Sequence, residues 1–181
     1  MTEALFWDLI DKSAKECNND AEQQSQWLAR RLSEFTLADI FEFQEHLIRR
    51  KRDAYDGRLM AALAVLDDMD DDDFQDFRLW LVSRGKAVFE KCLNDPEALA
   101  GIVEPGDWIT ASDIGEAAAK AYEQVTGRDD FHLRFQLALP PPELKNALVW
   151  QTREGYADPS KLRVLFPRLW EKFGERFQAG N

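Results

Sequence analysis

Residues 71–92 read DDDFQDFRLWLVSRGKAVFEKC, and the spacing of their apolar side chains decides the fold class. These side chains recur at steps of three and four, which places them on one face of an α-helix. Gly85 interrupts the pattern, so we expect a break or kink there. The leading aspartates favour a helix start before Phe74, because a carboxylate there accepts hydrogen bonds from free backbone N–H groups. The apolar stripe comprises Phe74, Phe77, Trp80, Leu81, Val88, Phe89 and Cys92.

Helical spacing of apolar residues continues over most of the chain. Side chains that cap helices, and prolines suited to a first turn, mark the expected starts. These starts lie at Thr2, Asp20, Thr36, Pro96, Ser112, Pro159 and Pro167. The pattern predicts a mainly α fold, a compact multi-helix bundle that forms a single helical domain over residues 1–181.

One stretch departs from helical spacing, namely FHLRFQLAL at residues 131–139. Apolar and polar residues alternate strictly there, which is typical of a half-buried strand. Three prolines at 140–142 end the pattern, and ALVWQT at 147–152 or Trp108–Thr110 could pair with it. We therefore expect a small β strand or hairpin near residues 131–152. If that strand lacks an internal partner, its free edge could pair with another chain.

The composition predicts a folded protein. With 45% hydrophobic and 12% aromatic residues, the 181-residue chain can build a core, which argues against disorder. No apolar run approaches the roughly 20 residues that a membrane helix needs, so we expect a cytoplasmic protein without membrane contact. Cys17 and Cys92 lack CxxC spacing, and we expect both to be buried, reduced thiols.

Negative charge is concentrated in the middle of the sequence. The formal net charge is −11 at pH 7, and residues 61–130 carry 17 acidic and 6 basic side chains. An excess of this sign argues against binding to nucleic acid or to an anionic membrane. The basic run Arg49–Arg52 does not alter this expectation, because four consecutive residues surround a helical turn instead of forming one face. The charge favours a partner protein with a basic surface.

Six of the seven residues from Asp67 to Asp73 are aspartates, which raises the question of a metal site. A calcium loop starting at Asp68 fails, because its sixth position is Asp73 instead of glycine and its twelfth is Leu79 instead of glutamate. Asp67, Asp68 and Asp71 match the DDxxD magnesium pattern of helical prenyl-diphosphate enzymes, but the larger bundle and second acidic motif of those enzymes are missing. A helix start needs only one or two aspartates. The surplus indicates a solvated loop or a surface for a cationic partner.

Signatures of catalysis are weak. His46 and His132 are the only histidines, too few for a His-rich metal centre. The sequence around Ser83 contains neither a GxSxG elbow nor a phosphate-binding loop. We therefore expect no catalytic residue and no cofactor, and a protein that is not an enzyme is favoured.

Five blocks of the sequence form a recognisable pattern: FWDLID (6–11), IFEFQEHL (40–47), residues 71–100, EAAAKAYEQVTG (116–127) and FPRLWEKFG (166–174). Together they resemble a bacterial family, domain of unknown function family 4240. The resemblance implies a helical fold and a bacterial origin rather than an activity. The family-type residues of the central block are Asp72, Asp73, Phe74, Phe77, Arg78, Trp80, Gly85, Val88 and Phe89. Asp67, Asp68 and Asp70 look like local additions.

The resemblance carries two further expectations. Residues 128–157 depart from the family's usual form, so they look like a variable insertion that contains the strand-like segment. In the central block, the aromatic residues are expected in the core. Arg78 lies one turn after the aspartates, and a structural salt bridge to that region or to an adjacent helix is expected for it.

Two functions remain open. The first is an acidic protein-binding module, most specifically an immunity or inhibitor protein that neutralises a basic, toxin-like partner through a charge-complementary surface. Its partner-binding residues would be Asp67, Asp68, Asp70, Asp71 and Asp76. The alternative is a divalent-metal-dependent enzyme acting on phosphate esters. Its magnesium or manganese ligands would be Asp67, Asp68, Asp71, Asp72 and Asp73.

Overall fold

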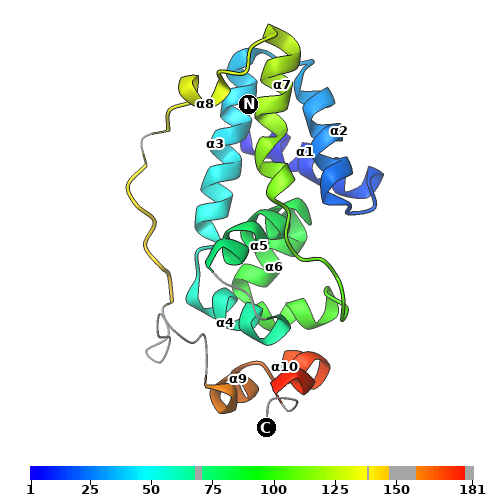
Figure 1. Ribbon diagram of the computed structural model, residues 1–181, viewed down its shortest axis with the longest axis vertical. Coiled ribbons are helices and arrows are strands. Elements are labelled where there is room, and N and C mark those ends of the chain that lie inside the picture. The colour runs from blue at the N-terminus through cyan, green and yellow to red at the C-terminus, as the bar shows by residue number, and fades with distance from the viewer. Residues whose placement is uncertain (68–70, 138, 147–157, 178–181) are drawn as a thin grey trace.

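Helices carry the fold of the computed structural model, which describes residues 1–67, 71–137, 139–146 and 158–177 (Figure 1). The longer α-helices are α1 (Glu3–Glu16), α2 (Ala21–Leu32), α3 (Leu37–Asp53), α4 (Gly57–Leu66), α5 (Asp71–Ser83), α6 (Lys86–Asn94) and α7 (Ala117–Thr126). The short α-helices are α8 (Phe131–Arg134), α9 (Pro159–Leu165) and α10 (Pro167–Phe173). The 3₁₀ helices are η1 (Pro96–Gly101), η2 (Ser112–Glu116) and η3 (Gly174–Phe177). The prediction of a mainly α fold is confirmed.

The helices point in different directions and are distributed over the length of the molecule (Figure 1). α2 packs against α7, and α3 packs against both α5 and α7. At the far end, α10 packs against α4 and η1. One cluster of buried side chains extends from Phe6 to Leu169. Over the described ranges, no helix is long and apolar enough to cross a membrane.

The predicted helix starts are formed by the expected side chains. Thr2, Asp20 and Thr36 each accept a hydrogen bond from the backbone N–H three residues later, at 3.3, 2.8 and 3.2 Å. Each bond satisfies one of the N–H groups that the first turn of a helix leaves without a partner. The predicted proline starts are also confirmed, because η1, α9 and α10 all begin with proline.

Buried aromatic side chains connect four of the first six helices in the core. Phe6, Phe43, Phe77 and Phe89 are fully buried and come from α1, α3, α5 and α6. The ring centroids of Phe6 and Phe43 lie 5.1 Å apart in a tilted contact, a favourable geometry for aromatic pairs. The core role predicted for the aromatic residues of the central block is confirmed.

The predicted break at Gly85 separates α5 from α6. Gly85 has a φ of +92°, which L side chains rarely adopt. The carboxylate of Asp11, on α1, approaches this turn closely and accepts a hydrogen bond from the backbone N–H of Lys86 at 2.9 Å. The first turn of α6 is therefore capped by a side chain from another helix. This contact gives both Gly85 and the second aspartate of the FWDLID block a structural role.

The predicted strand at 131–139 is wrong over the residues that the structure describes. Phe131–Arg134 form the single-turn helix α8, where Phe131 is buried while Leu133 is 81% exposed. Phe131 and Phe135, four residues apart, stack with centroids 5.6 Å apart, and both contact the ring of Phe41 on α3. This tertiary contact favours helical over alternating spacing. Pairing with another chain stays a prediction, and Phe131–Arg134 do not form the extended strand edge that it requires.

Neither of the two predicted hairpin partners is seen as a strand in the described residues. Residues 147–152 lie outside the described residues, and Trp108–Thr110 form no strand. In the described ranges, the only β-type pairing is an isolated bridge between Asp56 and Lys145.

Asp130 fixes the turn that leads into α8. Its carboxylate accepts hydrogen bonds from Tyr122 Oη at 2.8 Å, Arg128 Nη2 at 2.8 Å and Arg134 Nε at 2.7 Å. Partial desolvation works to raise the pKa of Asp130. The hydrogen bonds from Arg134 and Tyr122 and the positive charges of both arginines outweigh it and lower this pKa to about 2.

The lowered pKa of Asp130 predicts a defined pH dependence. Because the folded pKa lies below the unfolded value of about 3.9, the charged carboxylate stabilises the fold above about pH 4. We expect this contribution to fade as the pH falls toward 2. Thermal unfolding of the wild type and of Asp130→Asn should therefore differ at pH 7 and converge near pH 2. A difference that stays constant over this range would contradict the assignment.

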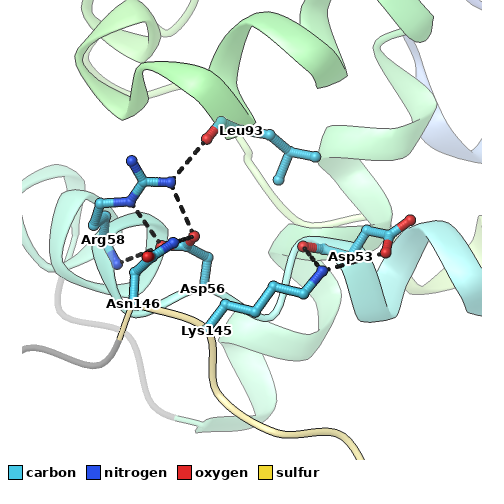
Figure 2. Close-up of polar contacts among 6 residues, drawn as sticks. All are labelled: Asp53, Asp56, Arg58, Leu93, Lys145 and Asn146. Atoms are coloured by element: carbon cyan, nitrogen blue, oxygen red, sulfur yellow. Dashed lines mark hydrogen bonds and ion pairs between the residues drawn. The ribbon is translucent and has the colours of Figure 1, made fainter.

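The chain beyond α8 returns to the helical core at the junction of α3 and α4 (Figure 2). Asp56, only 3% exposed, accepts hydrogen bonds from Asn146 Nδ2 at 2.5 Å and from Arg58 Nη2 at 3.1 Å. The same Arg58 nitrogen donates to the carbonyl of Leu93 at 3.1 Å. Lys145 Nζ forms an ion pair with Asp53 at 3.3 Å. A buried carboxylate thus connects the late segment to α4 and α6.

A second buried carboxylate holds α10. Glu97 Oε2 accepts hydrogen bonds from the backbone N–H and from Nε of Arg168, at 3.2 and 2.9 Å. Its Oε1 accepts the backbone N–H of Leu169 at 3.1 Å. Glu97, on η1, therefore caps the first turn of α10 and neutralises Arg168 in the same contact.

Candidate functional site

Trp108 is the most exposed large apolar side chain of the described residues, at 84%. It follows a tight turn in which Asp107 Oδ2 accepts the backbone N–H of Glu104 at 2.8 Å, and Gly106 has a φ of +90°. The turn is closed by its own hydrogen bonds, including Asp107 N–H to the carbonyl of Glu104 at 3.0 Å. A large aromatic ring held in water by an ordered turn is typical of a binding residue.

The indole of Trp108 borders three adjoining hollows. The first, of about 540 Å³, lies between α5, the start of α2 and η2, and contains Asp73, Asp76 and Asp113. A second, of about 400 Å³, shares Trp80, Arg84 and Trp108 with the first. The third, of about 420 Å³, also has Trp108 in its lining, together with the end of α4 and the start of η3. The third hollow is lined by Asp67, Glu104, Asp107 and Glu175, with Lys172 among them.

We call this region the Trp108 surface, defined by Trp108 with Asp67, Asp73, Asp76, Glu104, Asp107 and Asp113. Carboxylates line the hollows that border one exposed aromatic ring, and one of them, Glu104, forms an ion pair with Lys172 at 2.8 Å. A protonated amine or guanidinium placed over an indole is attracted by the ring, and neighbouring carboxylates add to that attraction. The chemistry of this surface suits a cationic group.

Among these carboxylates, Asp76 is the one whose negatively charged form is destabilised by its surroundings. Desolvation raises its pKa, and the negative charges of Asp73, Asp72 and Asp113 raise it further, while Lys51 opposes these effects. Part of the desolvation of this carboxylate has already occurred in the free protein. Binding a cation to Asp76 therefore costs less further desolvation than binding it to a fully hydrated carboxylate. Asp76 is thus the carboxylate best prepared for a positive partner group.

Arg84 forms part of the floor between the first two hollows. Its guanidinium lies 5.1 Å from the ring centroid of Trp80 and donates to the carbonyl of Asn19 at 2.6 Å. Burial lowers the pKa of Arg84 to about 10, so it stays charged at pH 7. Its hydrogen bonds go to Ser83 on α5, to Gln24 on α2 and to Asn19 before α2, so we assign it to positioning Trp80 and the loop around Asn19.

The predicted partner-binding aspartates are only partly brought together. Asp76 and Asp67 line two different hollows, which share Trp108. Asp68 and Asp70 lie outside the described residues, and Asp71 begins α5. Asp76 therefore belongs to the Trp108 surface through α5, whereas Asp67 reaches it from the end of α4.

The predicted metal ligands do not form a recognisable centre in the described part of the chain. Asp67 ends α4, whereas Asp72 and Asp73 lie in the first turn of α5. Asp72 Oδ1 accepts a hydrogen bond from Gln75 Nε2 at 3.2 Å. Among the described residues, no group of three or more His, Cys, Asp or Glu side chains is placed to hold a metal ion. The side chains of Asp68 and Asp71 lie outside that set.

The predicted salt bridge of Arg78 is wrong in the described ranges. Its Nε donates to the carbonyl of Phe74 at 3.2 Å, and its Nη1 donates to the carbonyl of Lys51 at 3.4 Å. The guanidinium lies 4.9 Å from the ring centroids of both Tyr55 and Phe74. Carbonyls and aromatic rings therefore take the place of the expected carboxylate.

The two cysteines are confirmed as buried free thiols. Burial raises the pKa of Cys92 to about 12, so its thiol stays protonated at pH 7. A protonated, buried thiol is neither a nucleophile nor a metal ligand.

The sequence pattern does not indicate Trp108 as a candidate binding residue, because it suggests only a possible strand position there. A signal was present: a tryptophan directly after Pro105-Gly106-Asp107 lies in a turn and outside every helical stripe. Glu104 and Asp107 are sequence neighbours of Trp108, whereas Asp113 lines the same hollow as Trp108 because η2 packs against α5.

Fold and surface define an all-helical protein with an acidic, aromatic-centred face. The chain belongs to the family of proteins of unknown function DUF4240, whose profile matches residues 1–124. The match ends within α7, so α8, α9 and α10 lie beyond it, as does the FPRLWEKFG block. No curated protein and no solved structure matches the chain.

Proposed function

We propose that this protein binds a partner protein with a basic surface, and that the Trp108 surface is the contact. The observation that carries the proposal is an 84% exposed tryptophan that borders hollows lined by carboxylates. Tryptophan and arginine are the residue types that most often dominate binding energy at interfaces, and they attract each other directly. The matching group on the partner would be an arginine or lysine side chain placed over the Trp108 indole.

The charge of the whole chain supports the same conclusion. A net charge of −11 attracts a basic partner and steers it toward the acidic face, mainly within the screening length of about 8 Å at physiological ionic strength. Such steering speeds association and sets specificity more than it adds affinity. Trp108 and the half-buried Asp76 would then supply the close-range contacts.

The specific form that we propose is an immunity or inhibitor protein. Toxins that act on nucleic acid carry basic substrate-binding surfaces, and an acidic protein that covers such a surface blocks it. An acidic surface with an exposed aromatic ring is complementary in charge to a basic substrate-binding site. This complementarity supports an inhibitor over a generic adaptor. The alternative, a metal-dependent enzyme acting on phosphate esters, has no favouring observation among the described side chains.

The first experiment measures binding of an arginine-rich peptide by calorimetry at low and physiological salt. Trp108→Ala is expected to weaken binding by about 10- to 30-fold, which corresponds to about 1.5–2 kcal/mol. Asp76→Asn should weaken it by several-fold. The matched control is Glu123→Gln, which removes one exposed charge from α7, away from the Trp108 surface.

The control decides whether the surface is specific. If Glu123→Gln weakens binding as much as Asp76→Asn does, and Trp108→Ala has no effect, only the total charge matters and the proposal fails. Asp76→Asn should also raise the free energy of unfolding slightly, by about 0.5 kcal/mol, because it removes repulsion among like charges. A loss of affinity without a loss of stability separates function from folding.

The inhibitor form is tested with the product of a neighbouring gene. Co-expression of the wild type should protect cells from that product, and the two should co-purify. Trp108→Ala should lose both effects while remaining folded. Protection by Trp108→Ala at wild-type level would overturn the assignment of the surface.

A further inference from the structure

A separate pocket of about 290 Å³ lies on another face of α5 from the one that borders the Trp108 surface. Residues 73, 76, 80 and 84 of the sequence face the first two hollows, whereas 74, 75 and 78 line this pocket. Its remaining walls come from the end of α3, from α4 and from the segment after α8. The lining residues are Tyr55, Met60, Phe74, Gln75, Arg78 and Pro142.

Arg78 is the unusual member of this pocket. Its side chain belongs to a residue that is only 6% exposed, yet no carboxylate in the described part of the chain pairs with it. Nε and Nη1 each donate to a backbone carbonyl, while no acceptor among the described residues is found for Nη2. Buried cations are normally paired, because removing them from water without a partner is costly.

A second cation lies beside Arg78. Desolvation lowers the pKa of Lys51, and the positive charge of Arg78 lowers it further, while Asp76 acts in the opposite direction. Desolvation likewise lowers the pKa of Arg78, and the charge of Tyr55 partly opposes this. Two cations therefore lie close together, and of the two only Lys51 interacts with a nearby carboxylate, that of Asp76.

The rings of Tyr55 and Phe74 fix the plane of the Arg78 guanidinium, with both centroids at 4.9 Å. With two edges of the guanidinium bonded to carbonyls, Nη2 remains as a donor at the pocket wall. Gln75 lies on the same wall, and its amide nitrogen, which donates one N–H to Asp72 at 3.2 Å, has a second N–H to offer. Met60, Phe74 and Pro142 supply apolar surface. The donors suit one small planar anion, and the apolar walls suit a hydrocarbon body attached to it.

We propose that this pocket binds a carboxylate that carries an apolar group, with Arg78 Nη2 and the Gln75 amide as its hydrogen-bond donors. A phosphate dianion is a poorer match, because it needs more donors than one nitrogen and one amide provide. Repulsion from Asp72 and Asp73 at the start of α5 would also be larger for a dianion than for a carboxylate. This site does not depend on the function proposed for the Trp108 surface.

The test uses phenylacetate as the probe, with phenylacetamide and inorganic phosphate as comparisons. Saturable shifts in the amide and side-chain NMR signals of Tyr55, Gln75 and Arg78 are expected with phenylacetate. Phenylacetamide should bind at least 10-fold more weakly, because it lacks the charge. Equal binding of the two compounds, stronger binding of phosphate, or shifts located elsewhere would each overturn the proposal.

Variants complete the test. Arg78→Met should abolish phenylacetate binding, and Arg163→Met, which removes an exposed arginine of α9, should leave it unchanged. Because Arg78→Met could also unfold the protein, Gln75→Leu serves as the second variant. Gln75 is exposed, so this change should keep the fold and weaken binding about 3- to 10-fold. Unchanged binding in a folded Gln75→Leu would count against the assigned donors.

Two sources of the carboxylate can be separated. A free small acid predicts that phenylacetate binds at least as well as a short peptide ending in phenylalanine. A chain terminus predicts that the peptide binds at least 10-fold more tightly and that amidation of its end abolishes binding. Binding of the amidated peptide at full strength would contradict the proposal for either source.

Discussion

Replacing Gly85 with alanine is expected to lower the free energy of unfolding by about 2–4 kcal/mol. Part of the loss comes from the backbone, since a φ of +92° with a ψ of 166° lies in a region that is almost restricted to glycine. The rest comes from the new Cβ, which would lie 2.4 Å from Asp11 Oδ1. Asp11 would have to move and release the backbone N–H of Lys86, which ends the capping of α6. Urea unfolding of both proteins measures the difference.

Two controls divide this loss into its causes. Gly106→Ala has a similar positive φ but no atom within 4 Å of the new Cβ, so it should cost clearly less than Gly85→Ala. In an Asp11→Ala background, the clash is absent and Gly85→Ala should cost only the backbone strain. Equal losses in the presence and absence of Asp11 would show that the contact between α1 and the turn has no energetic role.

Replacing Glu97 with alanine is expected to release α10 at a cost of about 2–4 kcal/mol. The change removes a buried carboxylate that accepts two backbone N–H groups and the Nε of Arg168. Leu169, which is fully buried, would lose the helix turn that positions it. Hydrogen exchange should show lost protection in α10 while α1, α2 and α3 keep theirs.

Glu171→Ala is the matched control for this change, because Glu171 lies on α10 and is exposed. It should leave hydrogen exchange in α10 within experimental error of the wild type. If Glu97→Ala instead unfolds the whole chain in one step, α10 is an integral part of the core rather than a separately docked helix.

The helices could be predicted because their signals are local. Capping side chains such as Thr2 and Asp20, together with the glycine at position 85, act within a few residues of where they lie. The strand at 131–139 was wrong for the opposite reason. Alternation is a local signal, but the stacking of Phe131 and Phe135 on Phe41 is a tertiary one, and it favours a helical turn.

The candidate site was predictable only in part. Aspartate enrichment drew attention to α5, and Asp76 lies on the Trp108 surface, where its role in binding stays a prediction. Trp108 itself could not be placed, because its neighbours on α5 are about 30 residues earlier in the sequence and only packing brings them together. Arg78 shows the same limit: nothing in its sequence context distinguishes a carboxylate partner from two carbonyls and two rings.

The two anchors at Asp56 and Glu97 have a consequence for how the sequence can change. Asn146 is held by the first and Arg168 by the second, so the chain between them is closed at both ends by contacts with the matched region. Loop-closure entropy grows only logarithmically, and doubling the number of residues in such a connection costs about 0.6 kcal/mol. Added residues between Asn146 and the start of α9 should therefore cost little stability, whereas α9 itself carries the fully buried Leu162 and belongs to the core. The length of this connection can change while α9 and α10 stay docked.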